Sequence, residues 1–123
     1  MNPTWNQLLA IAEAEVRATL ASLPGPLRSQ ARPLPVTYEP HPQPERLHSD
    51  YDPDLLGLFI GASRAHPDEH PLPPQIILFL ENLWEFSDRD TAIYREEIRT
   101  TYLHELGHYL GLEETDLEER GLE

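Results

Sequence analysis

The first pattern along the chain is a run of apolar residues that recur at steps of three and four between residues 3 and 22. This spacing places them on one face of a helix. The apolar positions are Trp5, Leu8, Leu9, Ala12, Val16, Leu20 and Leu23. Pro24-Gly25-Pro26 follows them and is typical of a helix end. We therefore predict a helix over residues 3–22 that buries this face.

Three segments in the middle of the chain predict strands, at residues 34–39, 55–60 and 76–80. The third run contains no polar residue, which is typical of a strand that is buried on both faces. The proline-rich stretches at 40–44 and 65–74 predict loops. Residues 81–86 follow the third run, and we expect them to be extended or irregular.

A second long helix is predicted from about residue 90 to 110. Its apolar positions are Tyr94, Ile98, Leu103, Leu106 and Leu110. Ser87-Asp88-Arg89-Asp90 offers side chains that can cap its start, and Gly111 stands where a helix C-terminal glycine is common. Thr115-Asp116-Leu117-Glu118 fits a capping box and predicts a short final helix.

The order of these elements is helix, three strands, then two helices. It predicts an α+β fold in which a short sheet of three or four strands packs on helices. The chain has 123 residues and shows no internal repeat, so we expect a single domain over residues 1–123.

The composition and net charge of the chain exclude some classes of binding partner. The chain carries 22 acidic and 9 basic residues, for a formal net charge of −13. This charge repels nucleic acid and anionic membrane surfaces, so we expect neither as a partner. No apolar run is long enough to span a bilayer, and the start does not resemble a secretion signal, so a cytoplasmic location is expected. The absence of cysteine leaves His, Asp and Glu as metal ligands.

The candidate metal-binding and catalytic residues lie in one short segment, His104-Glu105-Leu106-Gly107-His108, which has the form H-E-x-x-H. On a helix, residues four apart share a face, so His104 and His108 can bind one metal ion. The Glu105 carboxylate could take a proton from a metal-bound water. The spacing therefore predicts a metal site with Glu105 as the catalytic base.

A catalytic zinc site needs a third protein ligand. Gly111 can adopt a left-handed conformation and turn the chain back towards the helix. We favour Glu114, three residues beyond this glycine, as that ligand. Asp116 is the rival, although it would also suit the first turn of the final helix; Glu113 is a weaker candidate.

A simpler interpretation competes with this one. The histidines could belong to an exposed helical face, with Glu105 merely solvated. A second pair with the same spacing, His66 and His70, is flanked by Pro67 and Pro71, which disfavour a helix. We interpret that second pair as part of an exposed loop.

The pattern His104-Glu105-x-x-His108-x-x-Gly111-x-x-Glu114 resembles the small zincin-like metallopeptidase family of bacterial proteins. The segments at residues 56–61 and 74–79 extend the resemblance over most of the chain. It implies a minimal zincin fold with one zinc ion held by His104 and His108, and with Glu105 as general base.

The function predicted from these observations is a zinc-dependent metallopeptidase. It would hydrolyse peptide bonds in a peptide or protein substrate through a metal-activated water, and the substrate could pair with an exposed strand edge. The alternative is a non-catalytic metal-binding or protein-interaction domain with a vestigial zincin site.

Overall fold

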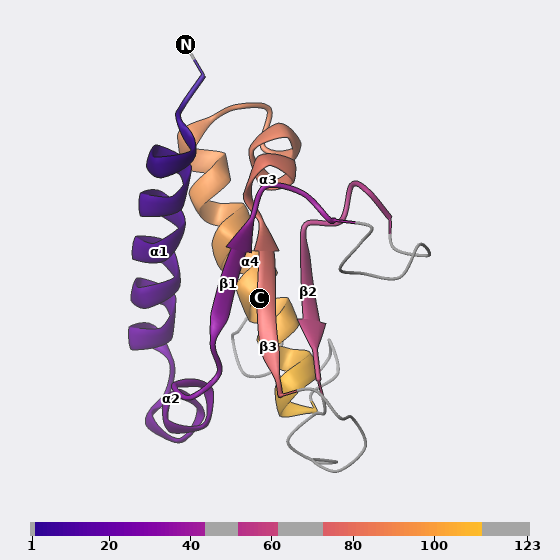
Figure 1. Ribbon diagram of the computed structural model, residues 1–123. Helices are drawn as coiled ribbons and strands as arrows, with labels where there is room; N and C mark the ends of the chain where they lie inside the picture. Colours follow the sequence, from indigo (N-terminus) through magenta and orange to yellow (C-terminus); the bar gives the residue numbers. More distant parts are fainter. Residues whose placement is uncertain (1, 44–51, 62–72, 112–123) are drawn as a thin grey trace.

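The computed structural model describes residues 2–43, 52–61 and 73–111 of the chain. Four helices and three strands are found in this part (Figure 1). In chain order they are α1 (Trp5–Ser22), α2 (Gly25–Ala31), β1 (Val36–Glu39), β2 (Gly57–Ile60), β3 (Gln75–Phe79), α3 (Leu80–Phe86) and α4 (Thr91–Leu110). The predicted α+β class is confirmed.

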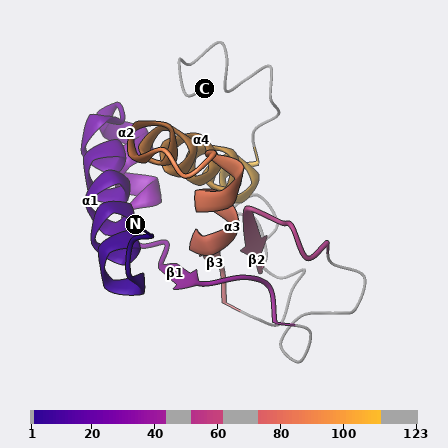
Figure 2. The ribbon, with the colours of Figure 1, turned by 90° about the horizontal axis from the view of Figure 1, so that it is seen from above.

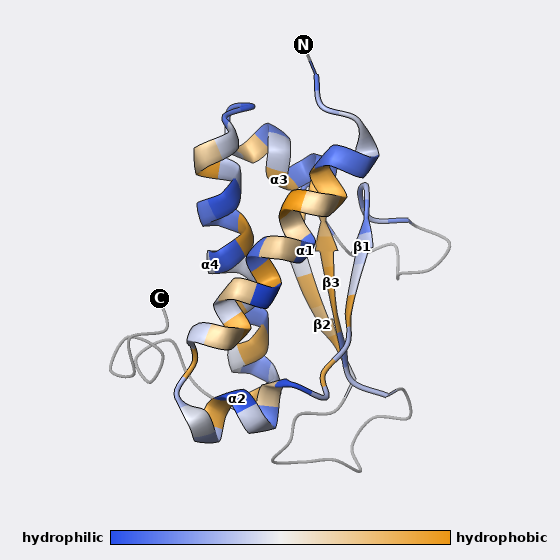
Figure 3. Ribbon diagram, turned by 90° about the vertical axis from the view of Figure 1, so that its left-hand side faces the viewer, coloured by the Kyte–Doolittle hydropathy of each residue, from blue (hydrophilic) through white to orange (hydrophobic). Residues whose placement is uncertain are grey.

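The three strands form one mixed sheet in the order β1-β3-β2. Strand β1 runs parallel to β3, with Val36 opposite Ile76. Strand β2 runs antiparallel to β3, with Gly57 opposite Leu78. The central position of β3 explains why Ile76 to Phe79 are all at most 3% exposed, as its unbroken apolar run predicted. Figure 3 shows β2 and β3 as hydrophobic and β1 as more polar.

The core lies between the sheet and the two long helices. Helix α4 packs across β2 and β3, and α1 packs against α4 (Figure 2). From α1, Leu8, Ala12 and Val16 are buried as predicted, whereas Trp5 at its first residue is 37% exposed. The Tyr94 hydroxyl donates a buried hydrogen bond of 3.0 Å to the carbonyl oxygen of Leu8 and so ties α4 to α1.

Helix α4 has the bounds and caps that its sequence predicts. The Asp90 side chain accepts a hydrogen bond of 3.0 Å from the backbone N–H of Ile93 and caps the start. Gly111 ends the helix in the left-handed conformation, with φ 73° and ψ 27°. Of the predicted core face, Tyr94, Ile98, Leu103 and Leu106 are buried, and Leu110 packs at the edge of the core.

Two short helices were not predicted. Residues 81–86 were expected to be extended or irregular, but they form most of α3, which begins at Leu80 directly after β3. Burial of Leu80 and Leu83 at helical spacing stabilises it. The Asn82 amide also donates to the carbonyl oxygens of Pro53 and Leu55. Helix α2 follows Pro24 with a proline in its first turn, a position that suits proline in a helix.

The predicted final helix near Thr115 and the proline-rich segment up to residue 72 lie outside the described residues. In the part of the chain that the structure describes, no helix has the length and hydropathy that crossing a membrane requires.

Candidate metal centre

The H-E-x-x-H motif occupies the last two turns of α4, as its spacing predicted. His104 and Glu105 are partly buried, and His108 is exposed. Neighbouring residues Leu103, Leu106 and Gly107 are buried and hold this part of the helix against the core. One face of the helix is thereby fixed to the sheet, and the histidines lie on another.

The two histidine side chains converge on one point. Their Nε2 atoms lie 3.2 Å apart, and their ring planes meet at 83°. Two nitrogen ligands at zinc-binding distance on one tetrahedral ion lie about 3.3 Å apart. The same separation also suits a hydrogen bond between neutral imidazoles. Together with Glu105, they offer ligand atoms that all lie within 4.8 Å of one another. The donor set thus fits a small divalent ion.

The Glu105 carboxyl group lies in a mixed environment. Burial raises its pKa above the usual value, because removal from water disfavours the charged form. His108, His104 and a hydrogen bond from the backbone N–H of Phe59 act in the opposite direction. A carboxylate with a raised pKa is better suited to accept a proton near neutral pH than an exposed one.

Two residues of β2 that the sequence did not single out as part of the site lie against the motif helix. A Cβ atom on Gly57 would lie 3.4 Å from Cγ of Glu105. The Phe59 ring packs against that of Tyr109, with centroids 5.8 Å apart. A glycine within a predicted strand was the available signal, because such a glycine often marks a close approach by another element.

Glu114, the predicted third ligand, lies outside the described residues, and so do the other two candidates, Glu113 and Asp116. His66, His70 and His48 fall outside them as well. His41 is exposed and makes its contacts with Pro42 and Gln43 beside it. Among the described residues, the structure therefore brings together His104, Glu105 and His108 and leaves His41 apart from them.

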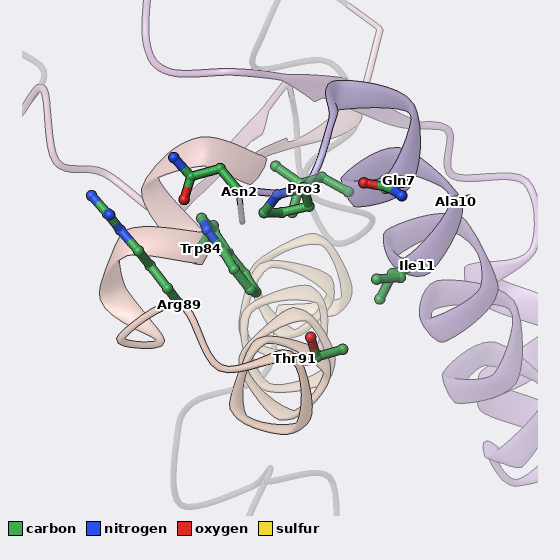
Figure 4. Close-up of a pocket in the computed structure, with 9 residues that line it drawn as sticks. Asn2, Pro3, Gln7, Ala10, Ile11, Trp84, Arg89 and Thr91 are labelled. Carbon is green, nitrogen blue, oxygen red and sulfur yellow. The ribbon is translucent and has the colours of Figure 1, made fainter.

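A separate cavity of about 600 Å³ lies at the other end of α4 (Figure 4). Pro3 and Ile11 from the α1 end, Trp84 from α3 and Thr91 at the start of α4 contribute to its lining. A helix of this length spans about 30 Å, and the H-E-x-x-H motif lies at its opposite end. This cavity is therefore distinct from the candidate metal centre.

A comparison with curated proteins finds no match. A family model described as zincin-like metallopeptidase matches residues 31–122. This span is more than half of the chain and includes all three strands and the whole of α4. Membership of this family implies a metal ion, and the His-Glu-His group is able to bind one. The chain belongs to the zincin-like metallopeptidase family, as the resemblance of its motif predicted.

Proposed function

We propose that this protein is a zinc-dependent peptidase whose metal centre is built on the end of α4. The observation that carries the proposal is the convergence of the His104 and His108 Nε2 atoms at 3.2 Å, beside the Glu105 carboxylate. Two imidazoles, with the carboxylate of Glu114 as third ligand, would suit zinc. Family membership supports peptide hydrolysis as the reaction.

In this proposal the histidines bind the metal ion and Glu105 transfers the proton. His104 and His108 would hold the ion, and zinc supplies Lewis-acid activation of water and of a substrate carbonyl group. Glu105 would accept a proton from water at a carboxylate oxygen and deliver it to the leaving amine. The burial that raises the pKa of Glu105 favours the first transfer, because the carboxylate binds a proton more readily than an exposed one.

We assign the third ligand to Glu114, with Asp116 as the rival. The left-handed conformation of Gly111 supports a turn of the chain directly after α4. Substitution of each acid by alanine would distinguish them, because loss of a zinc ligand lowers affinity far more than loss of a nearby charge.

The substrate we propose is an extended peptide or a segment of a protein. Strand β2 is at the edge of the sheet and lies against the motif helix through Gly57. An edge strand offers unpaired backbone groups with which an extended peptide can form hydrogen bonds. This arrangement would bring a backbone carbonyl group of the substrate near the histidine pair.

Metal content tests the first half of the proposal. The purified protein should contain about one zinc ion per chain after dialysis against zinc. His108→Ala should lose it, whereas His41→Ala, which removes an exposed histidine away from the motif, should retain it. Equal zinc content in all three proteins would contradict the assignment.

Hydrolysis tests the second half. Zinc-loaded protein would be incubated with fluorescein-labelled casein and with a mixture of unstructured peptides. Glu105→Gln should retain zinc and lose cleavage by a factor of at least about 100, the lower range for a general base. Glu96→Gln, at an exposed position on the same helix, is the matched control. Zinc binding without cleavage in the unsubstituted protein would favour the non-catalytic alternative.

A further inference from the structure

The hydrogen-bond pattern of β2 determines which of its backbone groups lie at the free edge of the sheet. The N–H of Phe79 donates to the carbonyl oxygen of Leu56, so these opposite residues form a hydrogen-bonded pair. Hydrogen-bonded and non-bonded pairs alternate along an antiparallel ladder. Leu58 and Ile60 therefore bond to β3, whereas the backbone N–H of Phe59 points away from it. Consistent with this, the N–H of Ile76, which lies opposite Phe59, donates to the carbonyl oxygen of Pro35 on the β1 side of β3.

Helix α4 lies close enough to this edge for Glu105 to reach it. The absence of a side chain at Gly57 permits the approach, since a Cβ there would lie 2.6 Å from Cγ2 of Thr101 and 3.4 Å from Cγ of Glu105. The contact between the rings of Phe59 and Tyr109 holds strand and helix together on the other side of the motif. Strand β2 is thus in contact with α4 from Thr101 to Tyr109.

We propose that Phe59 is a positioning residue for the active site, and that its backbone N–H at the free edge of β2 holds the Glu105 carboxylate in place. Among the described strands this N–H faces away from β3, on the side that Glu105 approaches. A hydrogen bond from the Phe59 backbone also lowers the pKa of Glu105, against the effect of burial. One lone pair of the carboxylate is used in this bond, and the remaining ones stay available to accept a proton. The catalytic meaning of this bond rests on the proposed function, whereas the bond itself does not.

A fixed donor matters because a glutamate side chain has three rotatable bonds. Without a partner at its end, the carboxylate would sample several rotamers, and only some of them would face the histidine pair. A hydrogen bond to rigid sheet backbone restricts these rotamers before substrate binds. Such preorganisation of a reacting group lowers the barrier of the reaction that it serves.

The proposal is tested by hydrogen exchange of single backbone amides, followed by NMR on the full-length protein after treatment with EDTA. An edge amide without a partner exchanges faster than one that donates to a carboxylate. Glu105→Ala should therefore accelerate exchange at Phe59 by about tenfold or more, the effect of losing one hydrogen bond to a charged group. Glu105→Gln keeps an acceptor oxygen and should restore much of the protection.

Leu58 and Ile60 are internal controls, since their amides bond to β3 and should exchange at the same rate in every variant. Glu96→Ala is the matched substitution at an exposed position of α4 and should leave Phe59 unchanged. Unaltered exchange at Phe59 in Glu105→Ala would overturn the proposal. Equal acceleration at all three strand residues would overturn it too, because it would indicate general loosening of β2. Since the protein is metal-free in this experiment, the result is independent of whether it hydrolyses peptides.

Discussion

A Cβ atom on Gly57 would lie 2.6 Å from Cγ2 of Thr101, a distance that real Cβ contacts do not reach. Strand β2 and helix α4 therefore meet at a point where no side chain larger than hydrogen fits. Glu105 lies one turn further along the same helix. The spacing between strand and helix at this contact sets how far the candidate metal centre lies from the edge of the sheet.

Gly57→Ala should destabilise the protein by about 1–3 kcal/mol, the usual cost of an added group in a well-packed core. The new methyl group would also approach Leu78 at 3.3 Å, which leaves little room for adjustment. Urea unfolding followed by circular dichroism measures the loss.

Thr101→Ala removes the Cγ2 atom and should recover a large part of this loss when combined with Gly57→Ala, so the two effects should not add. Gly25→Ala is the matched control. Apart from its chain neighbours Pro24 and Pro26, no atom lies within 4 Å of the added methyl group, so Gly25→Ala should cost less than Gly57→Ala. Strict additivity in the double variant would contradict the steric explanation.

The start of α4 depends on Asp90. Asp90→Ala removes the oxygen that accepts from the N–H of Ile93 and should lower the free energy of unfolding by about 0.5–2 kcal/mol. Asp90→Asn retains an acceptor of similar geometry and should cost much less. Thermal unfolding of the three proteins compares them, and an equal loss in both variants would assign the effect to charge instead of capping.

The buried hydrogen bond between α4 and α1 should contribute measurably to stability. Tyr94→Phe removes the hydroxyl that donates to the Leu8 carbonyl oxygen and should cost about 0.5–1.5 kcal/mol. The aromatic ring stays, so its edge contact with Trp84 is preserved. A denaturation midpoint that does not change would show that water replaces the hydroxyl without cost.

Stability should fall at high pH because of Tyr102. Burial raises the pKa of Tyr102 from 10.0 to about 12, so the folded state holds the phenolic proton more tightly than the unfolded state. The resulting stabilisation is complete below pH 10 and is lost as the pH rises towards 12. At pH 11 the loss from this one group amounts to roughly 1.4 kcal/mol.

Tyr102→Phe removes this titration. Urea unfolding at pH 8 and pH 11 should show a drop between the two pH values that is smaller in the variant than in the unsubstituted protein. The difference at pH 8 measures the packing effect of the substitution and serves as the reference. The same drop in both proteins would show that Tyr102 does not hold its proton as proposed.

A long helix with regularly spaced apolar positions and clear caps could be predicted from the sequence. Helix α4 begins at the Asp90 cap and ends at the left-handed Gly111, as expected from a run of apolar positions between the candidate caps at residues 87–90 and this glycine. Helix α3 was not predictable in the same way. It has only seven residues, and its stability comes from Leu80 and Leu83 in the core and from Asn82 bonding to the Pro53 and Leu55 carbonyl oxygens. Those partners are far from it in the sequence.

The sequence by itself determined the chemistry: two histidines and a glutamate, spaced so that any helix places them within reach of one ion. This follows from local geometry, because residues four apart share a helix face in every fold. Only the tertiary structure decided what stands beside them. The pairing of β2 with β3 placed Gly57 and Phe59 against α4, and that pairing depends on burial summed over the whole core, which short-range spacing does not contain.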